Sequence, residues 1–141
     1  MRRLLPFLAV AGLALALAGS VSGATSKRYV TDCADAVQHP KSIILLCGDA
    51  NEYLRALTWK SWGAATTTAT GKLGYVVCDP DCASGYEKTV PVNVTLSGTM
   101  TCKGKKLYAR MELAFPKGLP PKNSDYRHRT GTYKLVCPFG R

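Results

Sequence analysis

The chain lacks most of the residues and motifs on which enzymes commonly rely. Among its 141 residues there are only 2 histidines, the side chains best suited to proton transfer near neutral pH. No G-x-S-x-G, H-E-x-x-H or S-x-x-K pattern occurs, so the usual signatures of serine and zinc hydrolases are missing. Acidic residues are also scarce, with 9 Asp and Glu against 19 Lys and Arg. These absences favour a basic binding module over an enzyme and assign no catalytic residue.

A long apolar segment that would span a membrane is absent as well. Met1, Arg2 and Arg3 give a positive start, residues 4–17 are apolar, and small residues fill much of 18–24. The apolar run is shorter than the roughly 20 residues that a transmembrane helix needs. The pattern predicts a secretory signal peptide over residues 1–23, with an uncleaved membrane anchor as the alternative. Residues 24–141 are then one exported domain, too short for a second sizeable core.

The cysteines indicate the kind of compartment in which the protein folds. All 6 cysteines lie beyond the predicted signal peptide. An even number in a short exported chain predicts three disulfides, although the sequence leaves their connectivity open. Proximity along the chain favours the pairs Cys33–Cys47, Cys78–Cys82 and Cys102–Cys137. A zinc site is the competing interpretation. Zinc sites usually combine two closely spaced pairs of ligands, however, and the C-x₃-C pair of Cys78 and Cys82 has no similar second pair. We therefore expect no metal and no cofactor.

The body of the chain has the periodicity of β-strands. Val90, Val92, Val94 and Leu96 alternate with polar residues or proline, as in a half-buried strand. The same alternation predicts a strand over residues 107–115, with further strands at 43–47, 54–59, 67–77 and 132–137 and a turn at 103–105. Because no helical crossovers separate these strands, the pattern predicts an all-β fold. We expect a disulfide-stapled antiparallel sandwich of Greek-key type or a small barrel.

Several short motifs give the chain a resemblance to a known group. The stretch Leu57-Thr58-Trp59-Lys60-Ser61-Trp62-Gly63 follows an L-x-W-x-x-W-G pattern, and Cys78-Asp79-Pro80-Asp81-Cys82 follows C-x-P-x-C. With the closing Leu135-Val136-Cys137-Pro138, they resemble small secreted actinobacterial proteins of unknown function. The resemblance runs from about Ile43 to Pro138. It implies secretion and a shared disulfide pattern, and it implies no activity.

The two tryptophans are candidates for a platform on which sugars or bases stack. Residues three apart on a strand point to opposite faces, so Trp59 and Trp62 are not expected to form one surface. We expect one ring to fill the core and the other to be partly exposed.

Positive charge is concentrated in the last third of the chain. Bases and acids balance between Ala24 and Thr99, whereas the segment from Met100 onward has ten bases against Glu112 and Asp125, a net charge of +8. A basic segment of this kind favours a polyanion such as an anionic cell-wall polymer, an acidic lipid or a nucleic acid. Solubility and protection of strand edges are the alternative roles. The candidate polyanion-binding residues are Lys103, Lys105, Lys106, Arg127 and Arg129.

Two further hypotheses come from other functional classes. A small hydrolase of ribonuclease type would use His39 and His128 as base and acid, with Lys105 or Lys106 holding phosphate. A protease inhibitor would insert a stapled loop such as Cys78–Cys82, or the loop at residues 117–129, into its target. Our first expectation remains a secreted binding or cell-envelope interaction module.

Overall fold

The computed structural model describes residues 27–118 and 131–138, and all structural statements concern these two ranges. Six antiparallel strands form one sheet in the order β10-β9-β6-β5-β4-β3, and two separate hairpins, β1–β2 and β7–β8, flank it. The strands are β1 Val30–Asp32, β2 Asp35–Val37, β3 Ser42–Ile44, β4 Glu52–Lys60, β5 Thr67–Val77, β6 Tyr86–Ser97, β7 Met100–Cys102, β8 Lys105–Leu107, β9 Arg110–Ala114 and β10 Gly131–Lys134.

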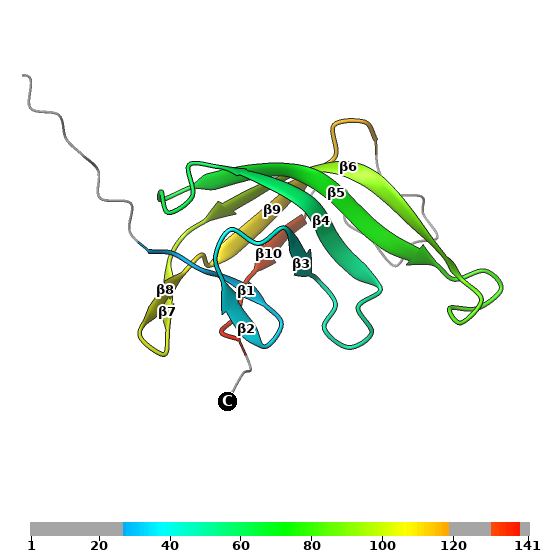
Figure 1. The fold of residues 1–141 in the computed structure, drawn as a ribbon, viewed down its shortest axis with the longest axis horizontal. Coiled ribbons are helices and arrows are strands. Elements are labelled where there is room, and N and C mark those ends of the chain that lie inside the picture. Colours follow the sequence, from blue (N-terminus) through cyan, green and yellow to red (C-terminus); the bar gives the residue numbers. More distant parts are fainter. Residues whose placement is uncertain (1–26, 119–130, 139–141) are drawn as a thin grey trace, which may run out of the picture.

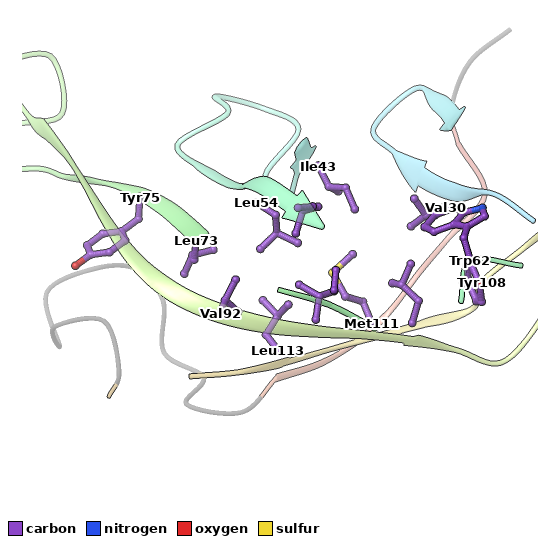
Figure 2. Packing of buried hydrophobic residues seen from close by; sticks show 14 of the residues in the cluster. Val30, Ile43, Leu54, Trp62, Leu73, Tyr75, Val92, Tyr108, Met111 and Leu113 are labelled. Carbon is purple, nitrogen blue, oxygen red and sulfur yellow. The ribbon is translucent and has the colours of Figure 1, made fainter. Parts of the chain in front are cut away.

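The sheet curls into half a barrel, and this curvature creates the core. Figure 1 shows β4, β5 and β6 arching over β1, β2 and β3. The prediction of an all-β antiparallel fold is confirmed, with an incomplete barrel as the observed arrangement. Figure 2 shows the side chains of Leu54, Leu73, Val92 and Leu113 lying on the concave face of the sheet.

The β1–β2 hairpin covers the gap between the two outermost strands of the sheet. Val30 on β1 is completely buried. Thr31 Oγ1 donates a 2.7 Å hydrogen bond to the carbonyl of Val136, just after β10, and Asp32 Oδ1 accepts one of 2.9 Å from the Ile44 amide on β3. The hairpin therefore connects both edges of the half-barrel through side-chain hydrogen bonds.

All three predicted disulfide pairs are confirmed. Cys33 bonds Cys47, Cys78 bonds Cys82, and Cys102 bonds Cys137, with no free cysteine in the chain. The first links the β1–β2 turn to the chain after β3. The last links the β7–β8 hairpin to the chain after β10. Each of these two bonds joins a small hairpin to an edge of the main sheet.

The predicted strand over residues 107–115 is wrong in one respect. The chain leaves one ladder after Leu107 and enters another at Arg110, because Tyr108 and Ala109 pair elsewhere. The Tyr108 amide donates to the carbonyl of Tyr29, and the Ala109 amide donates to Ser97. Strict alternation over residues 107–115 predicts that Tyr108 faces solvent. In the structure its side chain points inward at this interruption and is completely buried.

Candidate functional site

The two ends of the sheet differ in net charge, although Lys88 lies at the more acidic end and Asp35 beside the lysines of the other. The ladder pairs Lys60 with Thr68, Thr67 with Leu96, and Ser97 with Arg110, so the end of β4 and the start of β9 lie at one end. The β7–β8 hairpin is inserted there, between Ser97 and Arg110. We call this the basic end and define it by its exposed bases: Lys60, Lys103, Lys105, Lys106 and Arg110.

The opposite end carries acidic residues. Glu52 pairs with Tyr75 and Tyr75 with Lys88, which puts the start of β4, the end of β5 and the start of β6 together. We call this the acidic end and define it by its carboxylates, Asp49, Glu52, Asp79, Asp81 and Glu87. The ion pair of 2.8 Å between Arg55 and Glu87 lies on this side of the sheet. Figure 1 shows the β7–β8 hairpin and the far part of β5 and β6 at opposite ends of the molecule.

A tight turn presents the lysines of the β7–β8 hairpin. Cys102 pairs with Lys105, so only Lys103 and Gly104 connect the strands. Both have positive φ, 48° and 77°, as a two-residue hairpin turn matched to strand twist requires. Lys103, Lys105 and Lys106 are all exposed. The predicted turn at 103–105 is confirmed, and it holds three predicted polyanion-binding lysines within one short hairpin.

Tyr29 anchors this hairpin to the rest of the molecule. Its amide donates to the carbonyl of Lys106 and its carbonyl accepts from the Tyr108 amide, both at 3.0 Å. The ammonium of Lys105 lies 5.1 Å from the centre of the Tyr29 ring, within the range of a cation–π contact. Neither Lys105 nor Lys106 forms an ion pair with any residue in the described ranges. Their charges are therefore available to a ligand.

A cavity of about 250 Å³ opens beside the lysines. Its walls come from the β1–β2 turn, the β7–β8 hairpin and the chain after β10. Lys103 and Lys105 contribute the positive charge, Asp35 is the one carboxylate, and the Cys102–Cys137 disulfide forms part of the wall. The lysines thus border a concave surface held in place by a covalent bond.

An aromatic cluster supports the basic end from inside the molecule. The Trp62 ring lies 4.8 Å from Trp59 and 5.6 Å from Tyr108, both edge to face, and 4.7 Å from His39. The Tyr108 hydroxyl accepts a bond from the Gly63 amide and donates one to the carbonyl of Ala64. Burial raises the pKa of Tyr108, while the Gly63 hydrogen bond and the charge of Arg28 act in the opposite direction.

The expected geometry of the two tryptophans is partly wrong. Trp62 is buried and Trp59 half-buried, as expected, but their rings touch. The strand ends at Lys60, and Ser61 has a φ of 53°. Trp62 therefore lies beyond the strand, where the period-two rule no longer applies. Its indole nitrogen donates to Arg28, whereas that of Trp59 donates to Pro40, so both tryptophans have structural partners.

Arg28 is held against this cluster and serves the packing of the basic end. Its guanidinium donates to Gly98 and Thr99 and lies 5.3 Å from the centre of the Tyr108 ring. Its Nε is buried without a hydrogen-bond partner in the described ranges. Sequence reasoning did not single out Arg28, because its role depends on contacts about seventy residues away in the chain.

Other predicted residues lie apart or outside the described part. His39 is exposed against Trp62, and His128, Arg127 and Arg129 are outside the described residues, as is the predicted signal peptide. The Cys78–Cys82 loop is exposed at the acidic end, where Asp81 accepts a 2.8 Å hydrogen bond from the Ser84 amide. Hydrogen bonds from Ser84 lower the pKa of Asp81. The histidine pair and the loop at residues 117–129 therefore stay predictions, and so does an inhibitory role of the exposed Cys78–Cys82 loop.

Neither a cluster of metal ligands nor a membrane-spanning helix occurs in the part of the chain that the structure describes. Residues 27–118 and 131–138 contain no group of three or more His, Cys, Asp or Glu side chains that could hold a metal ion. No helix in these ranges is long and apolar enough to cross a membrane. The exposed lysines of the β7–β8 hairpin and the adjoining cavity form the candidate site.

No family model, curated protein or solved structure matches this chain. The resemblance to small secreted actinobacterial proteins stays a prediction, and functional inference rests on the residues of the basic end.

Proposed function

We propose that this protein is a secreted, non-catalytic module that binds an anionic polymer of the cell envelope through its basic end. The observation that carries the proposal is the spatial segregation of charge. Lys105 and Lys106 stand on a rigid hairpin without ion-pair partners in the described ranges, and the carboxylates of the acidic end lie at the opposite end of the sheet. Such a distribution orients the protein in the field of a polyanion.

Several features support a secreted location. Three disulfides are typical of proteins that fold in an oxidising compartment, and the predicted signal peptide agrees with this. The similarity to small exported actinobacterial proteins, carried by Trp59, Trp62 and the Cys78–Cys82 motif, points the same way. A cell-wall polymer with phosphate or carboxylate groups is an abundant anionic partner for an exported protein of this kind.

The proposal is tested by measuring binding to purified wall polymer across a series of salt concentrations. Lys105→Glu with Lys106→Glu should weaken binding about tenfold or more and flatten the salt dependence, because fewer counterions are released. Lys72→Glu with Lys88→Glu changes the net charge equally away from the basic end and serves as control. Equal losses in both double variants would reduce the interaction to net charge and contradict a localised site. RNA and anionic vesicles, titrated in parallel, should bind less tightly than wall polymer.

A further inference from the structure

A second cavity, away from the β7–β8 hairpin, lies where the half-barrel fails to close. It has a volume of about 160 Å³. Its walls come from β1, from β3 and the residues that follow it, from Met111 on β9, and from β10 with the residues after it. The two outermost strands of the sheet thus meet around this opening, and β1 lies between them.

The walls of this cavity are predominantly apolar. Ile43, Leu45, Met111 and Leu135 contribute side chains, and the Cys33–Cys47 disulfide adds another apolar surface. Two further lining residues remain in contact with water, since Ile44 is 37% and Val136 is 53% exposed. Exposed apolar side chains around an apolar cavity indicate a ligand site.

Among the residues that line this cavity, the one formal charge is positive. Lys134 is the only lysine, arginine or carboxylate-bearing residue among the lining residues. Its cross-strand partner is Arg110, a second base, and Glu112 lies two pairs further along the ladder, opposite Thr132. The nearby carboxylate of Asp32 already accepts the Ile44 amide hydrogen bond. A ligand with an apolar tail and an anionic head therefore complements this cavity.

The size of the cavity limits the tail. An engineered apolar cavity of about 150 Å³ is known to hold one benzene molecule. A volume of this order accommodates the last six or so carbons of an acyl chain and excludes a bulky ring system. Because the lining residues Ile44 and Val136 are exposed, the remainder of the ligand, with its charged head, lies at the surface.

We propose that this cavity binds a medium-chain carboxylate, with the end of the acyl chain between Ile43, Met111 and Leu135 and the carboxylate beside Lys134. Neither Lys105 nor Lys106 lines this site, although Lys134 pairs with Arg110 of the basic end and Val136 precedes Cys137, which lines the cavity there. A protein that holds a polymer at one site and a single-chain anionic amphiphile at another is suited to the surface of a cell envelope.

The test uses octanoate, octanol and octylamine as probes, each below the concentration at which it forms micelles. We expect saturable binding of octanoate by calorimetry, weaker binding of octanol and the weakest of octylamine. Val136→Asp should weaken octanoate binding about tenfold, because it places a carboxylate at the apolar opening. Leu46→Asp makes the same change at a side chain that is 42% exposed and outside the cavity, and it should leave binding within about twofold.

A second pair of variants tests the head group. Lys134→Gln should weaken octanoate binding without changing octanol binding, whereas Lys72→Gln should change neither. Failure of octanoate to saturate the protein, equal losses in the two aspartate variants, or a preference for octylamine would overturn the proposal. Lys105→Glu with Lys106→Glu should weaken the binding of wall polymer and leave octanoate binding within about twofold, because neither lysine lines this cavity. Failure of this proposal and failure of polymer binding can therefore be told apart.

Discussion

The two ends of the sheet differ in how they are held together as well as in charge. At the basic end, Trp62 packs against both Trp59 and Tyr108, and the backbone of Tyr29 is hydrogen-bonded to Lys106 and Tyr108. At the acidic end, β5 and β6 stay paired up to Val77 and Tyr86. The pairing of β9 with β6 ends earlier, at the pair of Ala114 with Asn93. In the described ranges the far part of β6 therefore has one neighbouring strand, and Tyr86 is 50% exposed.

This difference indicates which end requires a fixed geometry. Beyond the Glu52–Tyr75 pair, β5 and β6 continue alone to Val77 and Tyr86. A two-stranded ribbon is marginally stable alone, and the Cys78–Cys82 bond only staples its turn. The lysines of the basic end instead rest on a buried aromatic cluster and on a disulfide that links segments 35 residues apart in sequence. Rigid presentation of cations is what a binding surface needs, because less conformational freedom is lost on association.

The largest expected effect comes from removing the aromatic support of the basic end. Tyr108→Ala should lower the free energy of unfolding by about 5 kcal/mol, through the loss of a fully buried ring and of its hydrogen bonds to Gly63 and Ala64. Tyr86→Ala removes the same side chain from the acidic end and should cost less than about 0.5 kcal/mol. Urea denaturation measures both, and equal losses would mean that the two ends are equally important for stability.

Replacing disulfides by alanine pairs should give the next largest difference. Chain-entropy estimates assign about 4 kcal/mol to the Cys102–Cys137 bond and about 2 kcal/mol to Cys78–Cys82. We therefore expect a lower midpoint of thermal unfolding for Cys102→Ala with Cys137→Ala. The opposite order would show that the acidic ribbon depends on its staple more than the basic end depends on its long-range link.

Alkaline pH should destabilise the protein by a smaller amount through Tyr108. Its pKa is raised above the ordinary value of 10.0 because burial disfavours the phenolate. The stabilisation is fully present below the unfolded pKa and is lost as pH rises through the higher folded value. Unfolding free energies between pH 9 and 12 should fall more steeply in the wild type than in Tyr108→Phe.

Tyr53 offers a second comparison in the same experiment. The pKa of Tyr53 is also raised, mainly by burial. The hydrogen bond to Glu87 and the negative charge of Glu87 raise it further, whereas the positive charge of Arg55 lowers it. Tyr53→Phe should therefore remove a separate part of the alkaline loss. A curve for Tyr108→Phe that coincides with the wild type would contradict the role of buried Tyr108.

Much of the fold follows from local patterns in the sequence. A run rich in β-branched residues predicted the strand at 67–77 with its observed bounds, and alternation predicted the buried side chains of Val92, Val94 and Leu96. Proximity along the chain predicted the three disulfide pairs. These features depend on neighbouring residues, where periodicity and turn chemistry are informative.

The features that escaped prediction depend on contacts between distant segments. Tyr108 turns inward because Tyr29 accepts its amide hydrogen bond, and no local pattern shows that pairing. Lys60 joins the lysines of the β7–β8 hairpin only because the end of β4 and the start of β9 lie at the same end of the sheet. The charge count predicted a basic segment from Met100 onward. It did not predict a basic end that also includes Lys60.

The most direct test of localised binding is an amide NMR titration of the full mature chain with purified wall polymer. Binding through the basic end predicts that the largest shift changes fall on β7, β8 and Tyr29, with little change at Cys78, Cys82 and the turn between them. Adding salt should reverse these changes, since screening weakens exposed charge interactions. Changes centred on the acidic end, or spread evenly over both ends, would contradict the proposed function.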